Sequence, residues 1–191
     1  MRRCRMTDRA SGARAFTGLV IPASPLPTGL ATFRRRHIHH PGAAVPFHTT
    51  IVAPFLPLPE LDEAARARLR RVVAGLPSFE YEAGSICCFP TTSVLWLAPS
   101  PVRPFEDVAE ALHAAFPQAR PAAGLPTFHL TVALGRQPDD LSAALSDFRA
   151  GFEHRLPFRL RARHLDLYAE VDAAEVGGRY RRLARLAFGA L

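Results

Sequence analysis

The chain has 191 residues, of which 48% are hydrophobic and 21% charged, so it can bury a core and does not belong to the disordered class. Its uninterrupted apolar runs are far shorter than the roughly 20 residues that span a bilayer, so we expect no membrane-spanning helix. The formal net charge of +7 favours an anionic partner such as nucleic acid, although all 24 basic residues are arginine, a bias that a GC-rich genome alone can produce.

The first residues differ in character from the rest. Residues 1–14 are basic and aperiodic, which predicts a disordered basic tail before one domain over residues 15–191. No apolar stretch follows the arginines of this tail, so we expect no secretory signal. Three cysteines, two of them adjacent, cannot form a disulfide framework. We therefore expect a reducing, cytoplasmic setting. We also expect a monomer.

Short apolar runs and helical patterns follow along the domain. We expect strands at residues 16–21, 47–55, 79–89, 93–97, 128–134, 158–162 and 165–171, and helices at 30–40, 61–76, 105–116 and 141–152. The clearest helix is 61–76, whose apolar residues recur at helical spacing after Pro59 and Glu60. Residues 180–188 fit a strand or a helix, because Tyr180, Leu183 and Leu186 are spaced by three.

The order of these elements repeats along the chain. A strand, a helix, a Leu-Pro pair and two further strands begin at Phe47, and the same order begins at Phe128. His48 and His129, which head the two units, are 81 residues apart, and the two Leu-Pro pairs are 80 apart. Two copies of such a unit predict a bilobal α+β protein with a groove between its lobes that suits a ligand.

Each leading strand carries a His-x-Thr triplet. His48 with Thr50, and His129 with Thr131, project from one face of their strand because alternate residues share a face. Two imidazoles can supply a base and an acid near neutral pH, and hydroxyls can hydrogen-bond phosphate oxygens, as the opening of a cyclic phosphodiester requires. The residues alone leave open which histidine is the base. The competing interpretation is two edge-strand histidines beside threonines that favour strands.

The segments 46–55 (PFHTTIVAPF) and 126–133 (PTFHLTVA) resemble the paired motifs of the 2H phosphoesterase superfamily, and within it the 2'-5' RNA ligase-like proteins. The resemblance implies a bilobal fold with two pseudo-symmetric antiparallel sheets, flanking helices and a central groove. It also implies metal-independent chemistry without a cofactor on 2',3'-cyclic phosphates or 2',5'-phosphodiester linkages. The residues that it marks as catalytic or phosphate-binding are His48, His129, Thr50 and Thr131. Thr49 departs from the family, which usually has an apolar residue there.

Other side chains could contact a substrate, and each has a plainer interpretation. Arg136 follows the second motif strand and could reach the phosphate or be an exposed loop arginine. Phe55 and Tyr168 could stack on a base, whereas we expect Trp96 in the core. Residues 34–40 contain three arginines and three histidines that could grip a nucleic acid or hold a metal, but a solvated helix end is the expected role.

These patterns favour a cyclic phosphodiesterase or RNA ligase-like hydrolase acting on RNA ends or cyclic nucleotides by two-histidine acid–base catalysis, with reverse 2'-5' ligation as a further activity. The alternative is a non-catalytic protein that binds RNA or nucleotides in the same groove, which would not need both imidazoles. A metallohydrolase built on the histidines near His37 is a third class. We expect no metal at the paired motifs, because no carboxylate or cysteine is arranged around His48 or His129.

Overall fold

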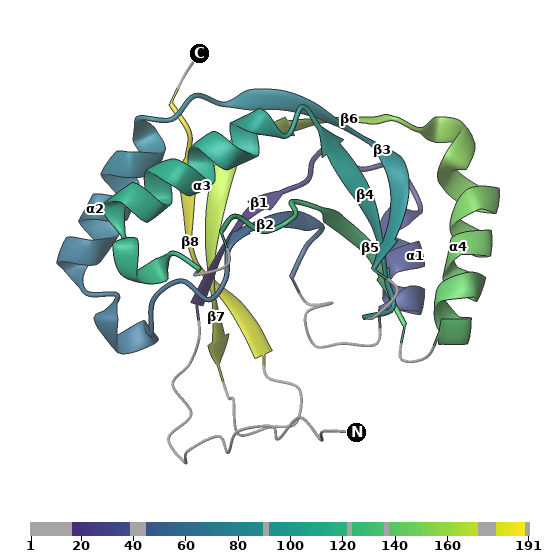
Figure 1. Cartoon of the computed structure of the whole chain (residues 1–191), viewed down its shortest axis with the longest axis horizontal. Helices are drawn as coiled ribbons and strands as arrows, with labels where there is room; N and C mark the ends of the chain where they lie inside the picture. Colours follow the sequence, from purple (N-terminus) through teal and green to yellow (C-terminus); the bar gives the residue numbers. More distant parts are fainter. Residues whose placement is uncertain are drawn as a thin grey trace.

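Strands and helices follow one another largely as the sequence predicts (Figure 1). The computed structural model describes residues 17–38, 45–89, 92–121, 124–135, 138–171 and 179–189. The predicted tail at residues 1–14 lies outside these ranges. The strands are β1 (Thr17–Pro22), β2 (His48–Val52), β3 (Phe79–Phe89), β4 (Val94–Ser100), β5 (Leu130–Leu134), β6 (Phe158–Ala162), β7 (His164–Val171) and β8 (Arg179–Ala187). The α-helices are α1 (Leu30–His37), α2 (Glu63–Ala74), α3 (Arg103–Ala115) and α4 (Pro138–Phe152), and short 3-10 turns are η2 (Leu58–Glu60), η3 (Pro117–Ala119) and η4 (Glu153–Arg155).

The helix expected at residues 61–76 begins two residues later and ends two earlier, as α2. Asp62 is its N-cap, and one carboxylate oxygen accepts a hydrogen bond from the backbone N–H of Ala65 at 2.7 Å. Leu69 and Val73, one turn apart, are buried against the core. The C-terminal segment, which fitted two patterns, is the strand β8.

The strands form one antiparallel sheet in the order β6-β3-β4-β5-β2-β1-β7-β8. At its centre β2 and β5 meet through one pair of opposed residues, Thr49 and Leu130. We call the strands β2, β1, β7 and β8 the His48 half of the sheet, and β5, β4, β3 and β6 the His129 half. The two antiparallel sheets expected from the sequence are thus present as two halves of one sheet, joined at a short central seam.

The halves do not correspond to the two sequential units of the predicted repeat. Helices α2 and α3 pack against the His48 half, and α1 and α4 pack against the His129 half (Figure 1). The first unit (β2, α2, β3, β4) therefore contributes to both halves, and so does the second unit (β5, α4, β6, β7). The symmetry of the strand order instead relates β1-α1-β2-α2 to β4-α3-β5-α4. The repeat placed the two motif strands in equivalent positions, but its boundaries were wrong.

One hydrophobic cluster lies behind the sheet and spans both halves. It includes Leu19 and Leu167 from the His48 half, and Leu97 and Leu160 from the His129 half. Thr49 is fully buried on this side of β2, and its hydroxyl has no hydrogen-bond partner among the described residues. The departure from the family pattern at this position therefore affects core packing, away from the motif face. Within the described residues, no helix has the length and apolarity to cross a membrane.

Candidate active site

The central seam brings the two His-x-Thr triplets onto one face of the sheet. Thr49 and Leu130, which oppose each other across the seam, are both fully buried in the core. The motif residues on either side of them project to the opposite face and are half-buried; they are His48, Thr50, His129 and Thr131. If the antiparallel register is continued by one residue, each histidine lies opposite the other strand's threonine. The histidines are then diagonal neighbours, a relation in which side chains are about 7–8 Å apart.

Both imidazoles are held by the same local hydrogen bond. The Nδ1 atom of His48 lies 2.6 Å from the carbonyl oxygen of Pro46, and the Nδ1 atom of His129 lies 2.7 Å from that of Thr127. Because a carbonyl oxygen can only accept, Nδ1 carries the proton in both rings. Each Nε2 is therefore left as the atom that can take or give a proton on the motif face, which is how a base or an acid is oriented.

The surroundings of the two rings differ. The pKa of His48 is lowered to about 4, mainly by burial and also by the positive charges of Arg34 and His129, although the hydrogen bond to Pro46 raises it. The buried Arg34 donates a hydrogen bond to the carbonyl of Val45, and its guanidinium lies 5.0 Å from the centre of the Phe47 ring. His48 is therefore neutral at neutral pH, with a free lone pair on Nε2. The charge of His129 acts on His48 because the seam brings the two rings together.

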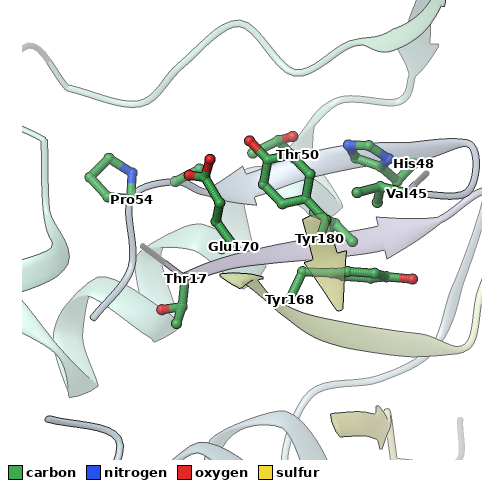
Figure 2. A pocket seen from close by; sticks show the side chains of 11 residues that line it. Thr17, Val45, His48, Thr50, Pro54, Tyr168, Glu170 and Tyr180 are labelled. Atoms are coloured by element: carbon green, nitrogen blue, oxygen red, sulfur yellow. The ribbon is translucent and has the colours of Figure 1, made fainter. Parts of the chain in front are cut away.

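A cavity of about 530 Å³ lies beside His48 on the motif face. Strand β2 contributes His48 and Thr50, and β7 and β8 contribute Tyr168, Glu170 and Tyr180 (Figure 2). Figure 2 shows the side chains of Glu170 and Tyr180 reaching toward Thr50, while the Tyr168 ring extends toward the His48 end of the cavity. Apolar walls with a few polar groups are typical of a ligand site.

Aromatic rings surround the second histidine. Phe89 and Trp96 stack on each other with centroids 4.9 Å apart, and their centroids lie 5.1 Å and 5.7 Å from that of His129. Trp96 is directly opposite Thr131 in the β4–β5 pairing, so it lies on the motif face and is only half-buried. The expectation that Trp96 is a core residue was wrong. The alternation of Leu95 and Leu97, both buried, around Trp96 was the sequence signal that could have placed it.

The other side chains that were predicted to contact a substrate do not lie together in the structure. Tyr168 lines the cavity beside His48, as a substrate contact requires. Phe55 is in the core, 4% exposed and edge-on to Phe116, so its suggested stacking role is corrected: burial makes the ring inaccessible to a base. Arg136 lies outside the described residues.

The arginine- and histidine-rich segment 34–40 is only in part a solvated helix end. Arg35 and Arg36 are exposed at the end of α1, but Arg34 is buried against the Phe47 ring. The Nε2 atom of His37 pairs with Asp147 of α4 at 3.0 Å. His39 and His40 lie outside the described residues. In the part of the chain that the structure describes, no three histidine, cysteine or acidic side chains are grouped to hold a metal ion.

Comparisons with known proteins identify the family and similar folds. A family model described as the 2'-5' RNA ligase superfamily matches residues 22–173. The structure of E. coli LigT complexed with 3'-AMP is similar with a TM-score of 0.57 and 18% identity, covering 91% of this chain and 98% of that one. TT0787 of Thermus thermophilus is similar with a TM-score of 0.54 and 13% identity, covering 92% and 98%. A comparison with curated proteins finds no match. The structural likeness bears out the predicted 2H phosphoesterase-like fold.

Proposed function

The chain belongs to the 2'-5' RNA ligase superfamily, and we propose that it is a phosphoesterase in which His48 and His129 act on one phosphate without a metal. Its substrates are 2',3'-cyclic phosphate or 2',5'-phosphodiester ends of RNA or nucleotides. One observation carries the proposal: two imidazoles on adjacent strands, each with Nδ1 tied to a carbonyl, present both Nε2 atoms to one face. This is the arrangement that an acid and a base sharing one phosphate need.

The lowered pKa of His48 supports the following roles. His48, with its lowered pKa, is the base in hydrolysis: its Nε2 takes a proton from water, and the water oxygen forms a bond to phosphorus. The bond from phosphorus to the leaving ribose oxygen breaks, and protonated His129 donates its Nε2 proton to that oxygen. The hydroxyls of Thr50 and Thr131 donate hydrogen bonds to the non-bridging oxygens, where negative charge builds up. For 2'-5' ligation the 5'-hydroxyl of a second RNA takes the place of water: His48 takes its proton, the 5'-oxygen bonds to the phosphorus of the 2',3'-cyclic phosphate, and His129 protonates the leaving 3'-oxygen.

Nucleotides are the ligand class that the relatives support. Structures of E. coli LigT hold 3'-AMP, NADP+ and ATP. The cavity beside His48 has the size and the aromatic walls for one nucleoside, and the Phe89–Trp96 pair offers a second aromatic surface beside His129.

The decisive test is a panel of 2',3'-cyclic nucleotides and 2',5'-linked oligonucleotides, with products identified and with excess chelator present. We expect turnover that survives the chelator. His48→Ala and His129→Ala should each lower kcat/KM by about 10²–10⁴-fold, because each removes one proton-transfer group. Thr50→Ala and Thr131→Ala should have milder effects on both binding and rate.

His154→Ala is the matched control, since His154 is exposed on η4. Near wild-type turnover in either motif variant would refute the two-histidine mechanism. Tight nucleotide binding without turnover of any substrate would instead favour the non-catalytic binding protein.

A further inference from the structure

Two arginines of β8 project onto the motif face because of a bulge. Across β7 and β8, Asp166 is opposite Arg185 and Tyr168 is opposite Arg182, so Leu183 is an extra residue without an opposite partner. In a regular strand, side chains three residues apart point to opposite faces. The extra residue reverses the alternation, and Arg182 and Arg185 both lie on the face of Asp166 and Tyr168. Bulges commonly redirect side chains in this way.

A fully buried carboxylate organises these arginines. The two oxygens of Asp166 accept hydrogen bonds from Nε and Nη2 of Arg185, each at 2.8 Å. Nη1 of Arg182 lies 3.6 Å from the same carboxylate. The side chains of Arg182 and Arg185 nevertheless remain 45% and 43% exposed, although that of Asp166 is not exposed at all. One carboxylate therefore fixes two guanidiniums at the surface and leaves one positive charge in surplus.

The arginine pair continues the groove that contains His48. Arg182 is directly opposite Tyr168 in the β7–β8 pairing, and Tyr168 lines the cavity beside His48. On the other side, Arg185 lines a second cavity of about 400 Å³ together with Pro46, whose carbonyl holds the His48 ring, and with Arg161 and Arg163. The path from His48 outward is thus first aromatic and then strongly basic.

We propose that Arg182 and Arg185 form a second phosphate site, which binds the phosphodiester next to the reacting phosphate of a single-stranded RNA. The proposal rests on the proposed function for the place of the reacting phosphate. Arg185 makes both hydrogen bonds to Asp166 and neutralises it, so the longer 3.6 Å ion pair of Arg182 leaves its hydrogen-bond donors available to a ligand. Fixed guanidinium forks suit phosphate oxygens because they donate several hydrogen bonds in one plane. A cyclic mononucleotide has no second phosphate and would not use this site.

The test measures binding, so that it does not depend on turnover. The probe is a fluorescein-labelled RNA tetranucleotide with a 3'-phosphate, followed by anisotropy over a salt series, with a nucleoside 3'-phosphate as unlabelled competitor. Arg182→Gln is the informative variant, because Arg185 still neutralises Asp166 and keeps both its hydrogen bonds. We expect the Kd for the tetranucleotide to rise about tenfold, as for a lost hydrogen bond to a charged group. The slope of log Kd against log salt should fall by about 0.7, and the affinity for the nucleoside 3'-phosphate should not change.

Arg181→Gln is the control: this exposed arginine of the same strand is opposite Ala169 and so lies on the other face. It should change neither affinity. Arg182→Lys, which keeps the charge without the fork, should bind the tetranucleotide with an intermediate Kd and serves as the folding check. The proposal is wrong if Arg182→Gln binds the tetranucleotide as wild type does. It is also wrong if Arg181→Gln weakens binding equally, or if Arg182→Gln weakens both ligands by the same factor. Failure of the proposed function would appear separately, because the wild-type protein would then not turn over any cyclic mononucleotide.

Discussion

His48 and His129 share one hydrogen-bonding pattern, but burial, together with a buried cation, lowers the pKa of His48. Arg34 lies against Phe47 of the first motif, where burial lowers the pKa of its own guanidinium and its charge lowers the pKa of His48. The sequence alone could not assign the base, because the two triplets are alike and Arg34 is 14 residues away from His48. The fold buries His48 and brings the charge of Arg34 to it, and both lower the pKa of this ring.

The pH dependence of kcat/KM should show the effect of the Arg34 charge on the pKa of His48. A base is active only when deprotonated, so wild-type kcat/KM should fall with decreasing pH through the pKa of His48, about 4, instead of through the ordinary value. Arg34→Met keeps an unbranched side chain against Phe47 but removes the charge, so the acid limb should move to higher pH. Arg35→Met, on the exposed side of the same helix, should leave the limb in place. An acid limb that does not move in Arg34→Met would show that Arg34 does not tune the base.

At the scale of elements, the sequence predicted which face of a strand each side chain occupies, but it did not predict which strands are adjacent in the sheet. Period-two alternation in residues 128–134 correctly separated His129 and Thr131 from the buried Leu130 and Val132. It could not reveal that β2 and β5 are adjacent, nor that each repeat unit is divided between the halves, because strand pairing joins residues far apart in the chain. The bulge at Leu183 could not be predicted for the same reason, because a bulge is defined by the pairing of β8 with β7.

We expect strand β4 to help fix the imidazole of His129, because its Trp96 ring packs against that imidazole. Loss of the indole in Trp96→Ala removes one of the two rings that flank His129, so the imidazole becomes less well fixed. We expect kcat/KM on the best substrate to fall by about 2–10-fold, the value of an aromatic contact of about 0.5–1.5 kcal/mol. Trp96→Phe should retain most of the activity. Unchanged kinetics in Trp96→Ala would show that the Phe89–Trp96 pair does not support the site.

At the scale of the whole molecule, the two halves of the sheet are interlocked. The His48 half takes β1 and β2 from the start of the chain and β7 and β8 from its end, and the segments between them build the His129 half. A single hydrophobic cluster joins both halves behind the seam. The His48 half therefore cannot assemble from a continuous piece of chain, and each half is also packed by a helix, α3 or α1, that lies in the chain among the strands of the other half. This interlocking fixes the two motifs relative to each other, which a reaction at one shared phosphate requires.

Such interlocking predicts one cooperative unfolding transition for the bilobal domain, and the single tryptophan makes it measurable. Trp96 reports on the His129 half, whereas Leu167 is buried on β7 in the His48 half. Leu167→Ala should lower the free energy of unfolding by about 2–5 kcal/mol, because it leaves a cavity in the shared core. If the halves unfold together, tryptophan fluorescence and far-UV circular dichroism should show the same shifted midpoint in urea. If instead the fluorescence transition stays at its wild-type midpoint while the dichroism shifts, the halves unfold independently and residues 15–191 are not one domain.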